Sequence, residues 1–188
     1  MLNKIPLMIP KKQPAIVTYY GGCAGDLVTA IIDPNSTELV GRYIKMTKTR
    51  EYFKIGSNQN RAKASQLHVL KRLTTQFKSI PSHWPHWHKE NKHKIFFISV
   101  NTFEESEWAR QRCMASFYGP ELEYMRKLLT LHSYNNFLLE RSKDVSTFAN
   151  VVIPLDVIRS GDLIRFIQPY FEFSLDYNLY EQWLLRNA

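Results

Sequence analysis

The chain has 188 residues, of which 44% are hydrophobic and 22% are charged, and its formal net charge is +8. These proportions exclude a disordered or collagen-like chain, and no apolar run approaches the ~20 residues that span a bilayer. The positive charge favours an anionic partner, a phosphorylated small molecule more than nucleic acid, because Lys and Arg form no single long block.

Two cysteines, Cys23 and Cys113, form no CxxC pair, which excludes a disulfide-rich scaffold and a four-cysteine zinc site. Residues 1–14 contain lysines and prolines and predict an extended leader, without the apolar segment of a secretory signal. We therefore expect a cytoplasmic protein with two free thiols, and one intramolecular disulfide is the alternative.

The predicted strands alternate with predicted helices. β-Branched, aromatic and apolar runs predict strands at 15–20, 39–45, 94–100 and 149–153. Apolar spacing and end signals predict helices at 26–32, 60–77, 102–118, 121–137, 154–159, 161–173 and 177–186. Residues 81–94, rich in proline and histidine, are expected to be irregular. The alternation favours one α/β domain over 1–188, a three-layer sandwich with a central, mainly parallel sheet.

The run at 94–100 is typical of a central parallel strand, because it is apolar without interruption. Thr102 and Glu105, three positions apart, have the spacing of a capping box that starts the next helix. In open parallel sheets ligands bind at the carboxyl ends of the strands, so we expect Gly21 and Asn101 to lie at one edge.

A glycine turn, Gly21-Gly22-Cys23-Ala24-Gly25, joins the first predicted strand to the helix that begins at Asp26. Such a turn directs several backbone amides and the positive end of the helix dipole toward one point, which favours phosphate or sulfate. Neither the Lys-Ser/Thr ending of the P-loop nor the G-x-G-x-x-G pattern is present. Two interpretations stay open: an anion site, with Asp26 turned away to cap the helix, or a tight structural turn.

These segments resemble the P-loop sulfotransferases over most of the chain. In that family a strand, a phosphosulfate-binding turn and a helix lie near the N-terminus, and Tyr19-Tyr-Gly-Gly-Cys-Ala-Gly-Asp-Leu27 is similar. A histidine-bearing segment that supplies the catalytic histidine resembles Ser82-His83-Trp84-Pro85. A strand and helix that bind the 3′-phosphate of the nucleotide resemble Ile95 to Arg112, and the closing helices resemble the pattern from Val152 to Leu184.

The resemblance implies transfer of a sulfuryl group from 3′-phosphoadenylyl sulfate to a hydroxyl or amine, with His83 as general base and without a metal. The donor-binding residues it implies are Gly21, Gly22, Cys23, Ala24, Gly25, Asp26, Asn101, Arg110 and Arg112. The sequence departs from the family where the loop lysine falls on Gly22 or Cys23 and the strand-end arginine falls on Asn101. The alternatives are a non-catalytic interaction protein that reuses this fold and, less favoured, a nucleic-acid binder.

Four histidines, His83, His86, His88 and His93, lie within eleven residues. Three imidazoles can bind zinc with an open fourth position. Because the spacing has no i, i+4 pattern and no nearby cysteine, a solvated basic loop is the preferred interpretation. The flanking Trp84 and Trp87 are either a stacking surface or anchors to the core.

Overall fold

The computed structural model describes residues 14–36, 42–46, 51–55, 77–83, 85–89, 94–115 and 131–187. Its strands are β1 (Ala15–Thr18), β2 (Arg42–Met46), β3 (Glu51–Ile55), β4 (Ser79–Ser82), β5 (Lys94–Ser99) and β6 (Val151–Pro154). Its α-helices are α1 (Gly25–Ile32), α5 (Phe103–Met114), α7 (Leu131–Ser146), α8 (Leu155–Ser160), α9 (Leu163–Ile167) and α10 (Tyr177–Asn187). Three 3₁₀ turns are η1 (Pro34–Ser36), η2 (Pro85–His88) and η3 (Gln168–Tyr170).

The main sheet has four strands in the order β4-β1-β5-β6, and every neighbouring pair is parallel. The α/β fold and the interior position of β5 are therefore confirmed. From β1 the chain proceeds to β4 on one side, and from β5 it proceeds to β6 on the other side. The connections thus change direction between β1 and β5, which are neighbours.

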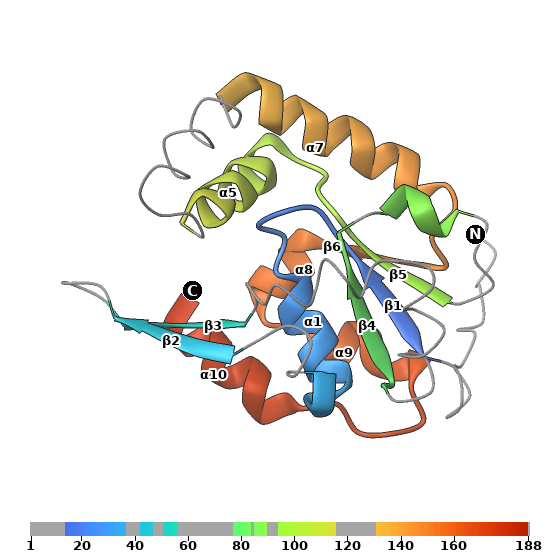
Figure 1. Cartoon of the computed structure of the whole chain (residues 1–188), viewed down its shortest axis with the longest axis vertical. Helices are drawn as coiled ribbons and strands as arrows, with labels where there is room; N and C mark the ends of the chain where they lie inside the picture. The colour runs from blue at the N-terminus through green and yellow to red at the C-terminus, as the bar shows by residue number, and fades with distance from the viewer. Residues whose placement is uncertain are drawn as a thin grey trace.

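Helices cover both faces of this sheet, with α7 on one side and α1 and α10 on the other (Figure 1). Two consecutive residues of β5 show the two faces, because successive side chains of a strand point in opposite directions. Phe96 stacks on Phe171 beyond η3, with ring centroids 5.3 Å apart. Phe97 instead contacts Tyr20, whose ring in turn meets Phe137 of α7.

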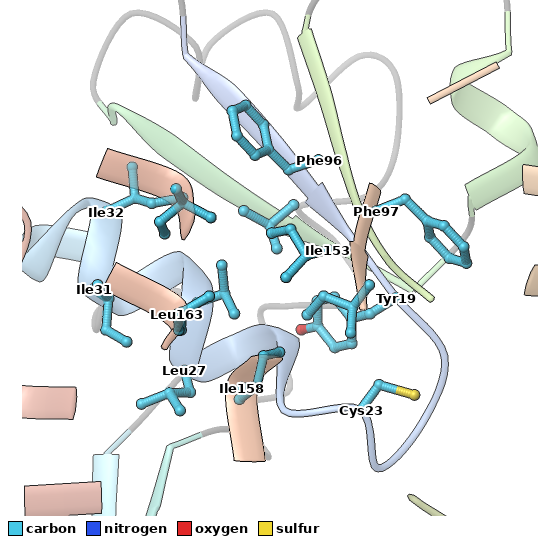
Figure 2. Packing of buried hydrophobic residues seen from close by; sticks show 14 of the residues in the cluster. Tyr19, Cys23, Leu27, Ile31, Ile32, Phe96, Phe97, Ile153, Ile158 and Leu163 are labelled. Atoms are coloured by element: carbon cyan, nitrogen blue, oxygen red, sulfur yellow. The ribbon is translucent and has the colours of Figure 1, made fainter. Parts of the chain in front are cut away.

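Helix α1 is part of the hydrophobic core, and all eight of its residues are buried. Figure 2 shows Leu27, Ile31 and Ile32 of this helix gathered with Ile153, Ile158 and Leu163 from the C-terminal part of the chain. A helix that is apolar on every side needs such enclosure. The composition of residues 26–32 predicts this burial, and the structure confirms it.

The prediction that 81–94 is irregular is wrong at its start, because β4 occupies 79–82 and pairs with β1. Its sequence, Ser-Ile-Pro-Ser, is a poor strand pattern. The strand forms because it is at the edge of the sheet, where Pro81 needs no ladder partner for its missing N–H. Tertiary hydrogen bonds also hold it, such as that from Ser79 Oγ to the carbonyl of Thr29, 2.6 Å long.

The strand predicted at 39–45 exists as β2, but it belongs to a separate sheet, an antiparallel pair with β3. Strand β3, which packs against α10 and α1, is not predicted from the sequence. The predictions for 1–13, 60–76 and 121–130, and those for Trp84 and His93, fall outside the described residues.

The remaining helices follow the predictions with shifted ends. Thr102 and Glu105 form the predicted capping box at the start of α5. Helix α7 continues to Ser146, beyond the predicted end at 137, and the helical turn predicted at 154–159 is α8. The helix predicted at 161–173 is shorter, because α9 gives way to the 3₁₀ turn that contains Pro169.

Candidate functional site

The carboxyl ends of three parallel strands lie side by side at one edge of the main sheet. Thr18 at the end of β1 is in register with Ser82 of β4 and with Phe97 of β5. The next residues of β1 and β4 are Tyr19 and His83, and β5 leads to Asn101. Between β1 and β5 the connections change direction, and in open α/β sheets this switch point is where ligands bind.

The glycine turn at the end of β1 is packed against α5 and α7. Gly22 has φ +85°, and a Cβ there would overlap the carbonyl of Ala109 in α5. A Cβ on Gly21 would lie 2.8 Å from Cys113 Sγ, and the Tyr134 hydroxyl donates to the Gly21 carbonyl at 2.9 Å. Glycine at 21 and 22 therefore allows α5 and α7 to approach the turn.

Helix α1 starts from this turn without a side-chain cap. Its N-cap is Ala24, in the left-handed conformation with φ 58°, and no side chain bonds the first amides from that position. Asp26 is the second residue of the helix and not its cap. Its buried carboxylate accepts a hydrogen bond from the Tyr19 hydroxyl. A Cβ on Gly25 would overlap the Tyr19 ring, so Gly25 leaves room for this contact.

His83 lies beside the glycine turn, which the sequence alone does not show. Its imidazole meets the Tyr19 ring edge-on, with the ring centroids 4.4 Å apart. Tyr19 thus links His83 to the carboxylate of Asp26 at the start of α1. No role of Tyr19 is predicted from the sequence, where its position directly before Tyr20 and the glycines is the available signal.

The neighbouring histidines have other partners. The His86 Nε2 atom lies 3.2 Å from the Tyr20 hydroxyl, and the buried His88 has its Nε2 atom 2.7 Å from Ser82 Oγ. Burial raises the pKa of Tyr20 to about 12. Within the described parts of the chain, no three His, Cys, Asp or Glu side chains are gathered as a metal site would require.

The two cysteines are free thiols on either side of Gly21. Cys23 is fully buried, and burial, with a smaller contribution from Cys113, raises its pKa to about 12. A neutral thiol cannot replace the positive charge of the lysine that the sulfotransferase resemblance implies at this point of the loop.

Asn101 follows β5 and belongs to a turn organised by Glu105. The buried Glu105 carboxylate accepts the backbone N–H groups of Asn101 and Thr102, at 2.5 and 3.2 Å, and that of Asp156 at 3.2 Å. The Asn101 side-chain amide donates to Ser99 Oγ at 3.3 Å. Asn101 is exposed at the same edge as the glycine turn, as predicted.

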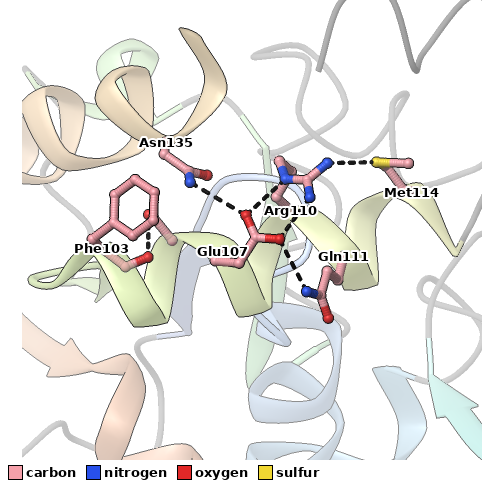
Figure 3. Close-up of polar contacts among 7 residues, drawn as sticks. Phe103, Glu107, Arg110, Gln111, Met114 and Asn135 are labelled. Carbon is pink, nitrogen blue, oxygen red and sulfur yellow. Dashed lines mark hydrogen bonds and ion pairs between the residues drawn. The ribbon is translucent and has the colours of Figure 1, made fainter. Parts of the chain in front are cut away.

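Arg110 is engaged in a network between α5 and α7, which Figure 3 shows. It donates two hydrogen bonds to Glu107, 2.6 and 2.9 Å long. Gln111 and Asn135 donate to the same carboxylate. The Arg110 hydrogen bonds, followed by those of Gln111 and Asn135, lower the pKa of Glu107 to about 2.

Arg112 lies on a different side of α5 and stacks on two indoles. Its guanidinium carbon is 4.6 Å from the Trp108 ring centroid and 5.1 Å from that of Trp183 in α10. Arg159 approaches the Trp108 ring as well, at 5.6 Å. The structure thus brings together the residues at 21–26 and His83, whereas Arg110 and Arg112 point toward different helices.

No family model matches this chain, and neither curated proteins nor solved structures provide a match. None of the described helices has both the length and the apolar character needed to cross a membrane.

Proposed function

We propose that this protein is a sulfotransferase-like enzyme of the P-loop class that binds 3′-phosphoadenylyl sulfate and transfers its sulfuryl group to a hydroxyl or amine. The observation that carries the proposal is the meeting of the glycine turn, His83 and the β5–α5 turn at the switch point of the sheet. This agrees with the resemblance of residues 19–27, 82–85 and 95–112 to that family.

The phosphosulfate end fits the start of α1. Because Ala24 provides no side-chain cap, the first amides of the helix and the positive end of its dipole are the donors for an anion. Gly21, Gly22 and Ala24 are only half-buried, so the backbone is accessible at these residues. Asp26 lies close to this point, but its carboxylate is held by Tyr19.

In this proposal neither Arg110 nor Arg112 binds a phosphate of the nucleotide directly. Arg110 is bonded to Glu107 and Arg112 is stacked on Trp108 and Trp183. Releasing either one would cost the contacts that it makes now. We therefore assign anion binding to the backbone of the turn and expect Arg110 and Arg112 to contribute by long-range charge alone.

When bound, 3′-phosphoadenylyl sulfate would supply the sulfuryl group and release 3′-phosphoadenosine 5′-phosphate as its S–O bond breaks. His83 would accept the proton that the attacking hydroxyl or amine loses as its oxygen or nitrogen bonds to sulfur, a role suited to an imidazole near neutral pH. The Tyr19 ring orients the imidazole, and the bond from Tyr19 to Asp26 keeps that ring against Gly25. The turn amides would stabilise the negative charge that develops on the leaving phosphate.

Two variants at Ala24 test the anion site by calorimetric titration with 3′-phosphoadenosine 5′-phosphate. Ala24→Asp places a carboxylate at the helix start, whereas Ala24→Gly places no side chain there, and both residues tolerate left-handed backbone. We expect binding in wild type and Ala24→Gly and at least a tenfold loss in Ala24→Asp. Equal affinity of the two variants would place the ligand elsewhere.

The role of His83 is tested by the rate of sulfuryl transfer to a panel of phenols and amines. We expect His83→Ala to lower turnover by about 10²- to 10⁴-fold while the affinity for 3′-phosphoadenosine 5′-phosphate is retained. The matched control is His86→Ala, which changes an exposed histidine in the same segment. A His83→Ala protein with full activity would refute the assignment.

A second candidate, a non-catalytic interaction protein, is favoured by the packing of Gly22 against Ala109 and by the engagement of both arginines. In that case the glycines serve only helix packing. A folded protein that does not bind 3′-phosphoadenosine 5′-phosphate at millimolar concentration would support this candidate against the enzyme.

A further inference from the structure

Both thiols of the chain contact the same residue, Gly21. The Cys23 thiol donates to the Gly21 carbonyl at 4.0 Å from within the glycine turn. Its sulfur is directed away from Leu27 and Ile158 (Figure 2). Cys113 comes from the last turn of α5, and a Cβ on Gly21 would lie 2.8 Å from its Sγ and 3.8 Å from its Cβ. Because Gly21 has no Cβ, the Cys113 sulfur packs directly on the backbone of the turn.

The electrostatic effects of the two thiols also show that they are neighbours. After burial, the largest cause that raises the pKa of Cys23 is Cys113. The Tyr134 hydroxyl donates to the Gly21 carbonyl, and burial, followed by Cys113 and then Cys23, raises the pKa of Tyr134. The interaction of two charges falls with distance, so each of these three groups lies near the other two. Two sulfurs and one hydroxyl thus gather around the Gly21 carbonyl.

The backbones that carry the two thiols are close as well. A disulfide joins Cα atoms about 4.4 to 6.8 Å apart, so it forms only where two backbones approach each other. A Cβ on Gly22, the residue before Cys23, would overlap the Ala109 carbonyl of α5. Ala109 and Cys113 are four residues apart and belong to the same face of that helix. We therefore expect a bond between the two sulfurs to need side-chain rotation and a small movement of the turn, without a change of fold.

We propose that Cys23 and Cys113 form a reversible disulfide that ties α5 to the glycine turn, by exchange with a small disulfide such as glutathione disulfide. Cys113 loses its proton to water, and its sulfur attacks one sulfur of glutathione disulfide, whose S–S bond breaks and releases one glutathione thiolate. Cys23 then loses its proton, and its sulfur attacks that of Cys113 and releases the second glutathione. The two cysteines lose two electrons in total, and glutathione disulfide is reduced to two thiols.

This order of steps follows from the access to the two thiols. Cys113 is partly exposed, whereas Cys23 is fully buried, with its pKa raised to about 12, and a buried neutral thiol is a poor nucleophile. Once Cys113 carries glutathione it has no thiolate charge, so its contribution to the raised pKa of Cys23 disappears. Cys23 then needs to reach only a neighbouring sulfur. The bond requires no ligand at the turn and is independent of the proposed function.

Incubation of the full chain with glutathione disulfide, followed by mass spectrometry without reduction, tests the proposal. We expect wild type to lose about 2 Da, the mass of two hydrogens, to yield a peptide pair that links Cys23 to Cys113, and to run as a monomer in non-reducing electrophoresis. The urea midpoint of the oxidised protein should be about 1 to 2 M higher than that of the reduced protein, and dithiothreitol should reverse this shift.

Single-cysteine variants are the matched controls. Cys23→Ser should stop at the mixed disulfide, with one glutathionyl group on Cys113. Cys113→Ser should react with glutathione disulfide at least about tenfold more slowly, because its remaining thiol is buried. Cys23→Ala replaces Cys23→Ser if the serine variant fails to unfold cooperatively.

Four outcomes with wild type would overturn the proposal. The first is a protein that keeps both thiols, and the second is one that stays at the mixed disulfide. The third is a disulfide that joins two chains instead of two cysteines of one chain. The fourth is a bond that forms only in urea or that lowers the urea midpoint, because such a bond would not fit the packing of α5 against the turn.

Discussion

The turns after β1 and β5 lie at the same edge of the sheet and each begins a helix, but they are stabilised differently. The β5–α5 turn uses its own side chains, because Thr102 caps the helix and Glu105 accepts the amides of Asn101 and Thr102. The glycine turn has no side-chain cap, and its conformation depends on Ala109, Cys113 and Tyr134 from distant helices.

The two turns therefore differ in whether side chains of the turn itself bond the backbone amides at the start of the helix. In the β5–α5 turn the Glu105 carboxylate already accepts the amides of Asn101 and Thr102, and the Thr102 hydroxyl accepts the amide of Glu105, so these three donors are engaged within the protein. At the start of α1 the Ala24 side chain bonds no amide, and the Leu27 amide donates to the Ala24 carbonyl at 3.1 Å. The turn whose shape is imposed by tertiary packing is therefore the one to which we assign the anion in the proposed function.

Gly22→Ala should have the largest effect, a loss of about 3 to 5 kcal/mol in the free energy of unfolding. The new methyl group would overlap the Ala109 carbonyl at a residue with positive φ. The control is Gly161→Ala, which also has positive φ but meets only Leu184 Cδ1, at 3.7 Å, and should cost about 1 kcal/mol. Equal losses in urea denaturation would contradict the close approach of α5.

Glu105→Ala should cost about 2 to 4 kcal/mol, because three backbone N–H groups lose their acceptor at a buried position. The adjacent Glu104→Ala is the control. Its side chain is 81% exposed and pairs with Arg159 at the surface, so its loss should change stability by less than about 0.5 kcal/mol. Chemical denaturation measures the loss of stability in both variants. A small loss in Glu105→Ala would mean that other groups organise the turn.

The network of Glu107 predicts a pH dependence of the packing between α5 and α7. The folded-state pKa, about 2, is lower than the ordinary value of 4.5, so the network stabilises the protein above pH 4.5. This stabilisation declines as pH falls toward about 2, where the carboxylate is protonated in the folded state too. In urea titrations the stability difference between wild type and Glu107→Gln should shrink over that interval. A difference independent of pH would show that the charge contributes nothing.

Ala24→Asn should have the smallest effect, a gain of about 0.5 to 1 kcal/mol. Asparagine tolerates the left-handed backbone better than alanine, and its side chain can cap the first amides of α1. Thermal unfolding would detect this gain. The control is Ala115→Asn, an exposed change at the end of α5. A loss of stability would indicate that the start of α1 has no room for a cap.

The sequence predicted most of the main fold because its signals there are local. The runs at 94–100 and 149–153 and the β-branched residues at 15–18 identified three strands of the sheet, and Thr102 with Glu105 identified the start of α5. Strands β3 and β4 were missed, because β4 contains Pro81 and is held by β1, and β3 depends on pairing with β2. Their stability comes from partners distant in sequence.

For the candidate site, the sequence by itself determined which residues follow β1 and β5 and that a glycine turn begins α1. Only the tertiary structure decided that His83 lies against Tyr19, that Asp26 is bonded to Tyr19, and that Arg110 and Arg112 are engaged by Glu107 and two tryptophans. A local pattern fixes the residue type and the backbone propensity at a position. Which charges and rings meet depends on how helices pack, and that is set by burial and shape over the whole chain.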